Sequence, residues 1–115
     1  MDWKLLTTAA QLQEIKEKSA SKVQVIFKHS TRCGTSAMVK TRIERSAAPS
    51  DIDFYFLDLI SYRNISNLIE QEFMIRHESP QVLLISKGEC VYNESHYGIR
   101  MEDIVAEAGS KANNK

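Results

Sequence analysis

Cys33 is the residue in this sequence whose type and position best suit covalent chemistry. It follows a β-rich stretch, Val23 to His29, and precedes a segment from Gly34 to about Ala47 for which we predict a helix. The first turn of a helix offers unpaired backbone N–H groups and a partial positive charge. Both favour a thiolate, and the neighbouring Arg32 adds a cation. The sequence therefore predicts a nucleophilic cysteine at a strand-to-helix turn.

Ser36 stands three residues after Cys33, where a dithiol enzyme has its second cysteine, so the motif reads Cys33-Gly34-Thr35-Ser36. A serine hydroxyl can hydrogen-bond a thiolate but cannot form a disulfide. The predicted chemistry is therefore monothiol: Cys33 attacks a mixed disulfide, takes up the small thiol and is released by a second thiol. The alternative is an inert cysteine that packs like a small hydrophobe, but the polar residues around the motif argue against burial.

The elements that must position these residues alternate along the chain. Thr8 and Gln11 form a capping box that predicts the start of a first helix, and Lys87-Gly88-Glu89 predicts a hairpin turn. The further predicted elements are an extended lead-in at Trp3 to Thr7, strands at Asp53 to Ile60, Gln81 to Ser86 and Cys90 to Asn93, a helix bearing Ile65, Leu68, Ile69 and Phe73, and a last helix bearing Met101, Ile104, Val105 and Ala108 that stops at Gly109.

This order of elements predicts the fold class. The first two strands are linked through a helix and should be parallel, with a right-handed crossover. The last two strands should form an antiparallel hairpin. We therefore expect a mixed four-stranded sheet with helices on both faces, a thioredoxin-like three-layer α/β/α sandwich. We assign residues 1–109 to this single domain and expect the polar residues 110–115 to be disordered.

The Ser79-Pro80 pair directly precedes the predicted strand from Gln81 to Ser86. Thioredoxin-like folds place a cis proline at this point, beside the active cysteine, and the backbone of the preceding residue pairs with the substrate chain. Without the fold argument, a trans proline that ends a helix is the simpler interpretation. With it, Ser79 and Pro80 are predicted to shape the substrate groove.

The same topology separates the remaining candidates. The strand that begins after Pro80 runs away from Cys33, so Cys90, just past the next turn, should lie roughly 17–20 Å from the active end. We therefore interpret Cys90 as a strand residue that does not resolve a bond on Cys33. The returning strand brings His96 back, either to support the thiolate or ligand or as an ordinary surface histidine.

Length and composition limit the classes of function. The chain has 115 residues, and its 15 basic and 15 acidic residues balance to a net charge of zero, which argues against nucleic acid or a membrane as the main partner. Its longest apolar runs are far shorter than the ~20 residues of a membrane span, and its first residues lack the pattern of a secretory signal. Two cysteines cannot build a disulfide framework. We therefore expect a cytoplasmic domain with reduced thiols.

Two clusters of side chains are candidate binding sites. His29, Cys33 and His96 lack the four ligands and spacing of a closed zinc site, so we predict no metal. The basic residues near the motif suit the carboxylates of an anionic small thiol, or simply form a solvated helix face: Lys28, Arg32, Lys40, Arg42 and Arg45.

Three stretches together resemble one known family, the monothiol bacilliredoxins, also called YtxJ-like general stress proteins. They are Phe27-Lys28-His29-Ser30-Thr31-Arg32-Cys33 with Ser36 following, His77-Glu78-Ser79-Pro80-Gln81-Val82, and Ser95-His96-Tyr97. The resemblance extends from about Trp3 to Ala108. Thr35 replaces a bulky apolar residue of the family, and Gly34 also departs from its pattern.

The resemblance implies a bacterial, cytosolic redox role with S-thiolated proteins as partners. It implies that Cys33 removes bacillithiol from mixed disulfides, with bacillithiol as co-substrate and no tightly bound cofactor. By position, Ser36 takes the place of the second cysteine, Pro80 is the active-site proline and Ser79 lies beside it. Arg32, Gly34, Thr35 and His96 would contact the substrate or the small thiol. The resemblance leaves the oligomeric state open.

Two alternatives remain at this point. A monothiol glutaredoxin would use glutathione or an iron–sulfur cluster, and the Cys33-to-Ser36 motif fits its C-G-x-S form. Against it, the proline follows Glu-Ser rather than Thr-Val, and Asn93-Glu94-Ser95 replaces the expected Gly-Gly pair. The second alternative is a non-catalytic redox sensor or binding module, in which a modified Cys33 changes the affinity for a partner.

Overall fold

The computed structural model describes residues 1–113, and its helices and strands alternate along them. The elements are β1 (Lys4–Leu5), α1 (Ala9–Lys18), β2 (Val23–His29), α2 (Gly34–Glu44), β3 (Ile52–Asp58), α3 (Arg63–Phe73), β4 (Gln81–Ser86), β5 (Glu89–Ser95), a 3₁₀ turn η1 (His96–Gly98) and α4 (Met101–Asn113).

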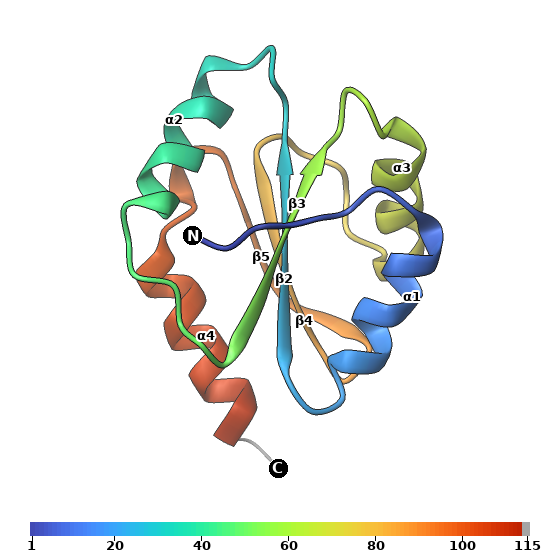
Figure 1. Ribbon diagram of the computed structural model, residues 1–115, viewed down its shortest axis with the longest axis vertical. Coiled ribbons are helices and arrows are strands. Elements are labelled where there is room, and N and C mark those ends of the chain that lie inside the picture. Colours follow the sequence, from blue (N-terminus) through green and yellow to red (C-terminus); the bar gives the residue numbers. More distant parts are fainter. Residues whose placement is uncertain (114–115) are drawn as a thin grey trace.

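The strands form one mixed sheet in the order β1-β3-β2-β4-β5. Strand β3 is parallel to both β1 and β2. Strand β4 is antiparallel to both β2 and β5. Helices α2 and α4 lie on one face and α1 and α3 on the other (Figure 1). The predicted three-layer α/β/α class is therefore confirmed, but the predicted four strands are too few. The lead-in segment adds β1 at the edge beside β3, and a strand of two residues is too short to show a local pattern.

Alternation along β2 explains why both faces of the sheet are covered. Val25 and Phe27 point into the apolar cluster beneath α2 and α4, whereas Ile26 belongs to the cluster beneath α1 and α3. All seven residues of β2 are buried. A strand buried on both faces, at the centre of the sheet, fixes the position of whatever follows its carboxyl end.

Short sequence motifs correctly predicted the start of α1 and the turn between β4 and β5. The Thr8 hydroxyl accepts a hydrogen bond from Gln11 N and the Gln11 side chain returns one to the backbone of Thr8, so the predicted capping box is present. The β4–β5 hairpin turns at Lys87 and Gly88, which have φ values of 53° and 79°. Positive φ at both central residues is the geometry that matches the twist of a two-residue hairpin, and glycine adopts it without strain.

Two predicted helix ends are wrong. Helix α2 ends at Glu44 rather than about Ala47, with Arg45 as its C-cap. Helix α4 continues through Gly109 to Asn113, because that glycine keeps a helical backbone and its neighbours sustain the hydrogen bonding. Residues 110–113 of the predicted disordered tail are therefore helical, while 114–115 lie outside the described residues. Among residues 1–113, no helix is both long and apolar enough to cross a bilayer.

Asp53, near the start of β3, is a buried carboxylate that contributes to stability. Burial raises its pKa, but hydrogen bonds from Gln24, Lys22 and Lys4 outweigh that effect and lower the pKa of Asp53 to about 2. The folded pKa lies below the unfolded value, so this contribution is present above about pH 4 and is lost as the pH falls towards 2. We expect Asp53→Asn to lower the free energy of unfolding at pH 7 by about 2 kcal/mol.

Urea denaturation at pH 7 and at pH 2.5 measures this contribution. The difference between wild type and Asp53→Asn should shrink at the lower pH, whereas Asp51→Asn, a change at a neighbouring exposed carboxylate, should behave like wild type. A constant difference at both pH values would contradict the assignment to ionised Asp53.

Candidate active site

Cys33 is the N-cap of α2 and lies just beyond the carboxyl end of β2. Its backbone N–H donates to Ser30 O at 3.2 Å, and its carbonyl accepts from Ala37 N at 3.1 Å. The side chain is partly exposed, and both Arg32 and Gly34 are exposed. The structure thus places the predicted nucleophile at a helix N-terminus, where solvent and a second molecule can reach it.

Ser36, in the first turn of the helix, is completely buried. Its Oγ lies 2.7 Å from Nδ1 of His29 and accepts a hydrogen bond from Ser30 N at 3.1 Å. The sequence predicts that Ser36 stabilises the Cys33 thiolate, whereas in the structure its hydroxyl contacts Ser30 and a histidine that the prediction did not include. The available signal was strand alternation, because His29 shares the face of Val25 and Phe27 and must point towards α2.

His29 is 7% exposed and lies among aromatic rings, with 5.2 Å between its ring centroid and that of Phe56. Burial lowers the pKa of His29, and the nearby Lys40 lowers it further, while Asp58 and Glu44 act in the opposite direction. The net direction is downwards, so the imidazole is neutral at pH 7. A neutral imidazole beside a buried hydroxyl can accept a proton.

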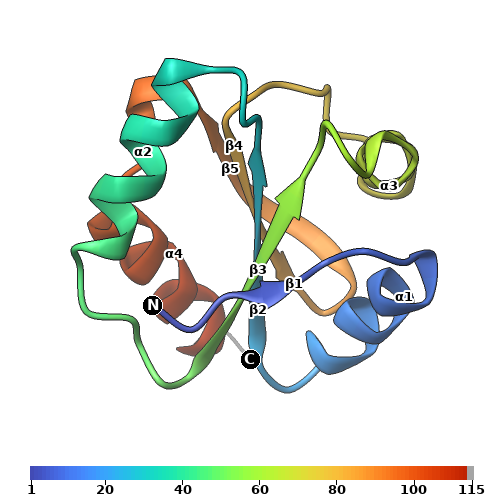
Figure 2. The same cartoon turned by 45° about the horizontal axis from the view of Figure 1, so that its top comes forward.

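The Ser79–Pro80 peptide bond is cis, as predicted. The register pairs Lys28 with Gln81, so Pro80 lies at the same end of the sheet as the carboxyl end of β2. The Pro80 carbonyl accepts a hydrogen bond from His96 N at 2.9 Å. Figure 2, with this end tilted forward, shows the start of α2, the loop into β4 and the segment after β5 gathered around one edge.

The segment after β5 contacts the loop before β4 on one side and α2 on the other. Nε2 of His96 lies 3.6 Å from Oε2 of Glu78, in the loop before β4. On the other side, Thr35 Oγ1 donates to the Tyr97 hydroxyl at 3.3 Å. The predicted site residue His96 lies in η1 itself, and η1 reaches the second one, Thr35 on α2, through Tyr97. Tyr97 belongs to a stretch that carries the family resemblance, but it was not among the predicted site residues.

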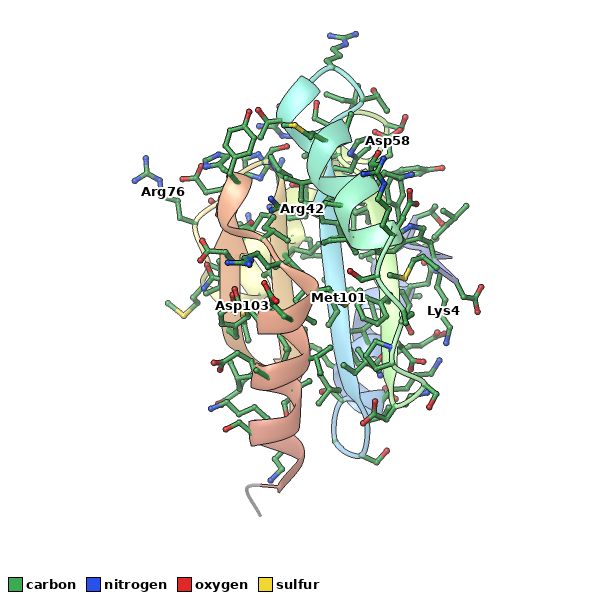
Figure 3. The ribbon with its side chains drawn as sticks, turned by 90° about the vertical axis from the view of Figure 1, so that its left-hand side faces the viewer. Lys4, Arg42, Asp58, Arg76, Met101 and Asp103 are labelled. Carbon is green, nitrogen blue, oxygen red and sulfur yellow. The ribbon has the colours of Figure 1, made fainter. Side chains whose placement is uncertain are left out.

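Arg42 completes the attachment of this segment to α2. It donates to the carbonyl of Tyr97 at 2.8 Å and also to that of Ile99, and Figure 3 shows it between α2 and the chain that leads into α4. Lys40 is paired with Glu44 at 2.9 Å. Of the basic residues considered for an anionic ligand, Arg32, Arg42 and Arg45 are exposed, and the guanidinium of Arg42 is engaged by these two carbonyls.

Lys28 does not belong to that surface. Its side chain is 0% exposed, and Nζ donates to Oε1 of Gln81 at 3.2 Å on the α3 side of the sheet. Adjacent residues of a strand point to opposite faces, so Lys28 and His29 lie on different sides of β2. The sequence-based grouping of Lys28 with the exposed basic residues is therefore wrong.

Comparison with protein families decides the family of the chain. Residues 4–104 match the family model of the monothiol bacilliredoxin BrxC. The chain belongs to the monothiol bacilliredoxin family. The match covers the Cys33 motif, the Ser79–Pro80 pair and the segment around His96, and it confirms the family expected from these three stretches. A thiol redox function follows from membership.

Solved structures agree on the fold of this bacilliredoxin family member. One, described as a candidate oxidoreductase with a thioredoxin fold, is 28% identical over 91% of each chain, with a TM-score of 0.78. The thioredoxin of Malassezia sympodialis is 18% identical over 96% of this chain and 91% of its own, with a TM-score of 0.73. That of Fasciola hepatica is 16% identical over 94% and 98%, with a TM-score of 0.74.

The second cysteine of this bacilliredoxin lies at the far end of the sheet. Cys90 pairs with Ile85 next to the β4–β5 turn, whereas Ser95 pairs with Gln81 at the active end. The Cys90 thiol donates to Tyr92 O at 3.3 Å, and burial raises its pKa. Among residues 1–113, no group of three or more histidine, cysteine or carboxylate side chains is arranged to hold a metal ion.

Proposed function

We propose that this protein is a monothiol thiol–disulfide oxidoreductase that removes bacillithiol from mixed disulfides on cytoplasmic proteins. The observation that carries the proposal is the position of Cys33, partly exposed at the N-terminus of α2. Ser36 stands where a second cysteine would be, and Cys90 lies beside the turn at the other end of the sheet. These positions disfavour an internal disulfide on Cys33, so in this proposal a thiol from a second molecule completes the reaction.

The reaction proceeds in two exchanges. The Cys33 thiolate attacks the bacillithiol sulfur of the mixed disulfide, the S–S bond breaks, and the substrate protein leaves as a thiolate that takes a proton. A second bacillithiol thiolate then attacks the bacillithiol sulfur on Cys33, which releases Cys33 and forms bacillithiol disulfide. One free bacillithiol is consumed for each mixed disulfide: it leaves as bacillithiol disulfide together with the bacillithiol taken from the substrate, and the Cys33 thiolate is regenerated.

The edge around Cys33 offers surfaces for both parts of the substrate. In this proposal, Ser79 and Pro80 form one wall of the groove for the thiolated protein, and His96 lies next to them through the contact of its N–H with Pro80 O. Gly34 leaves open space beside the thiol, since nothing lies within 4 Å of a Cβ placed there. Thr35 borders the opposite side through Tyr97.

The positive charge near the motif favours an anionic small thiol. Arg32 directly precedes Cys33 and is exposed, whereas Arg45 caps the other end of α2 and lies away from the motif. A guanidinium binds carboxylates through two parallel hydrogen bonds. Neutral overall charge keeps this attraction local to the site rather than spread over the surface.

The test is transfer of the thiol from a defined mixed disulfide. A peptide carrying bacillithiol on its single cysteine is mixed with the reduced protein, and intact mass with peptide mapping follows both molecules. We expect the peptide to lose bacillithiol while Cys33 gains it, and added bacillithiol to return Cys33 to the free thiol. The same peptide carrying glutathione is the matched comparison.

Three outcomes would contradict the proposal. Faster transfer of glutathione than of bacillithiol would move the protein to the glutaredoxin alternative. Rapid adduct formation on Cys33 with no release by bacillithiol would favour a sensor. A disulfide between Cys33 and Cys90 would contradict the monothiol mechanism.

A further inference from the structure

The loop that leads to Pro80 is hydrogen-bonded to the sheet through the side chain of Gln81, which is 1% exposed. Its Nε2 donates to Arg76 O at 3.0 Å, and its Oε1 accepts from Glu78 N at 3.4 Å. The Arg76 side chain extends away from the protein (Figure 3), so its carbonyl is the group that joins this residue to the sheet. Gln81 therefore holds two backbone groups of the segment that directly precedes Ser79 and Pro80.

Helix α3 holds the loop backbone between those two contacts. Oε2 of Glu70 accepts a hydrogen bond from His77 N at 2.7 Å. The Ser79 hydroxyl, by contrast, is buried and makes no hydrogen bond among the residues that the structure describes. The side chain of Ser79 therefore does not hold the loop, and the position of the Ser79–Pro80 peptide depends on the contacts of the residues on either side.

The ammonium of Lys28 decides which way the Gln81 amide faces. A glutamine amide can present either its oxygen or its NH₂ group to a neighbour, whereas an ammonium is a donor only. Lys28 Nζ donates to Gln81 Oε1 at 3.2 Å. This orientation leaves Nε2 for the carbonyl of Arg76 and keeps the oxygen within reach of Glu78 N. A reversed amide would place donor against donor at Lys28 and oxygen against oxygen at Arg76.

Stability alone does not account for a lysine at this position. The Lys28 side chain is completely buried, and burial lowers its pKa to about 8, so it still carries its proton at pH 7. A methionine could fill the same space without a buried charge. Residues that break the rules of stable packing in this way are expected at functional sites.

We propose that Lys28 and Gln81 are positioning residues for the substrate groove: the ammonium orients the amide, and the amide fixes the backbone before the Ser79–Pro80 peptide. This inference rests on the proposed function, in which that peptide forms one wall of the groove. A loop that is fixed before the substrate arrives loses no further conformational freedom on binding. Both side chains lie on the α3 side of the sheet, whereas Cys33 begins α2 on the other side. The two residues therefore affect substrate binding rather than the reactivity of the thiol.

The experiment measures the transfer of bacillithiol from the single-cysteine peptide at pH 7, as a function of peptide concentration and at constant free bacillithiol. Lys28→Met removes the group that orients the amide. Gln81→Glu keeps an oxygen for Lys28 and Glu78 N but removes the donor to Arg76 O. We expect each variant to raise KM for the peptide about fivefold, the effect of one lost hydrogen bond, and to leave kcat within about twofold of wild type.

Alkylation of Cys33 by iodoacetamide separates the groove from the thiol. In chains that also carry Cys90→Ser, both variants should be alkylated at the wild-type rate, because this small reagent does not use the groove. Slower alkylation would place the effect on the thiol and would overturn the proposal. Circular dichroism excludes unfolded variants, and Lys28→Met decides alone if Gln81→Glu does not fold.

Gln24→Met is the matched control. Gln24 is also a completely buried side chain of β2 on the same face as Lys28, but its amide donates to Asp53 at the other end of the strand. It should lower stability in urea and leave KM unchanged, whereas Lys28→Met should raise both stability and KM. A merely structural role would make KM follow stability, so an equal rise of KM in Gln24→Met would contradict positioning by Lys28.

Hydrogen exchange of backbone amides reports on the loop itself. His96 N–H donates to Pro80 O at 2.9 Å, and Leu59 N–H donates to His29 O at 3.0 Å, at the same end of the sheet. In Lys28→Met, the His96 amide should exchange about fivefold faster while the Leu59 amide does not, because only the loop is loosened. Wild-type exchange at His96, or a wild-type KM, would refute the inference. Exchange needs no mixed disulfide, so a wild-type protein that fails to transfer bacillithiol would count against the proposed function and leave this measurement decisive.

Discussion

Replacement of Cys33 by serine is expected to abolish thiol transfer completely. The serine hydroxyl has the position of the thiol at the start of α2 but does not attack a disulfide sulfur at neutral pH, because exchange requires a thiolate. The rate should fall to that of the uncatalysed exchange between peptide and free bacillithiol. Release of a fluorescent peptide from its bacillithiol mixed disulfide measures this rate directly.

Cys90→Ser is the matched control, since it removes the other thiol of the chain and leaves Cys33 untouched. Cys90 lies beside the distal turn, and burial raises its pKa, which keeps it protonated. We expect Cys90→Ser to retain the wild-type rate and the same adduct on Cys33. Loss of transfer in Cys90→Ser, or measurable transfer in Cys33→Ser, would require a two-cysteine mechanism.

The parts of this fold that could be predicted are those specified by neighbouring residues. The capping box at Thr8 and Gln11 and the glycine turn at Gly88 are complete within a few residues of sequence. The bounds of β2 and β4 were also correct, because a strand buried on both faces is a continuous apolar run between polar breaks. Such signals do not depend on the rest of the molecule.

Two predictions failed for different physical reasons. Strand β1 exists only because Lys4 and Leu5 pair with Tyr55 and Phe56, about fifty positions along the chain. Both of its residues are exposed, so no burial pattern marks them. Helix α4 passes Gly109 because a single glycine lowers helical stability by only about 1 kcal/mol and does not by itself end a helix.

The candidate site also has features that the sequence predicted and features that it did not. A strand followed by a helix locates Cys33, and the hairpin returns His96 to Pro80. The sequence did not reveal that Ser36 bonds to His29, because a strand residue and a helix residue meet only once the turn between them is built. Nor did it show that Lys28 is enclosed, since a lysine next to a surface motif is ordinarily exposed.

The enclosed Lys28 side chain is part of a polar network beneath the loop that leads to Pro80. Oε1 of Gln81 accepts from Lys28 Nζ at 3.2 Å and from Glu78 N at 3.4 Å, and its Nε2 donates to Arg76 O at 3.0 Å. Lys28 is thus one of the donors around a glutamine that ties the loop backbone to the sheet. The carboxylates of Glu70 and Glu78 attract the charge of Lys28, and the guanidinium of Arg63 repels it.

This environment makes Lys28 destabilising when it is charged. Burial lowers the pKa of Lys28 to about 8, against an ordinary value of 10.5, and the attraction of Glu70 offsets only part of the effect. The unfolded chain therefore binds more protons than the folded chain between pH 8 and 10.5. Stability must rise with pH across that window, and below pH 8 the full cost of about 3 kcal/mol is present.

Lys28→Met is expected to raise the free energy of unfolding at pH 7 by about 2 kcal/mol, because methionine fills the same space without a charge, less the hydrogen bond lost to Gln81. Urea denaturation at pH 7, 8, 9 and 10 measures the effect. The advantage of the variant should disappear towards pH 10, as Lys28 becomes neutral in wild type. The raised pKa values of Cys90 and Tyr92 give the opposite slope in both proteins, so they cancel in the difference.

Lys18→Met, at an exposed lysine of α1, is the control and should leave the pH dependence of stability unchanged. An advantage that stays constant up to pH 10 would show that folded Lys28 keeps its proton and that its pKa is not lowered. A loss of stability at pH 7 would show that its bond to Gln81 outweighs the cost of burying the charge.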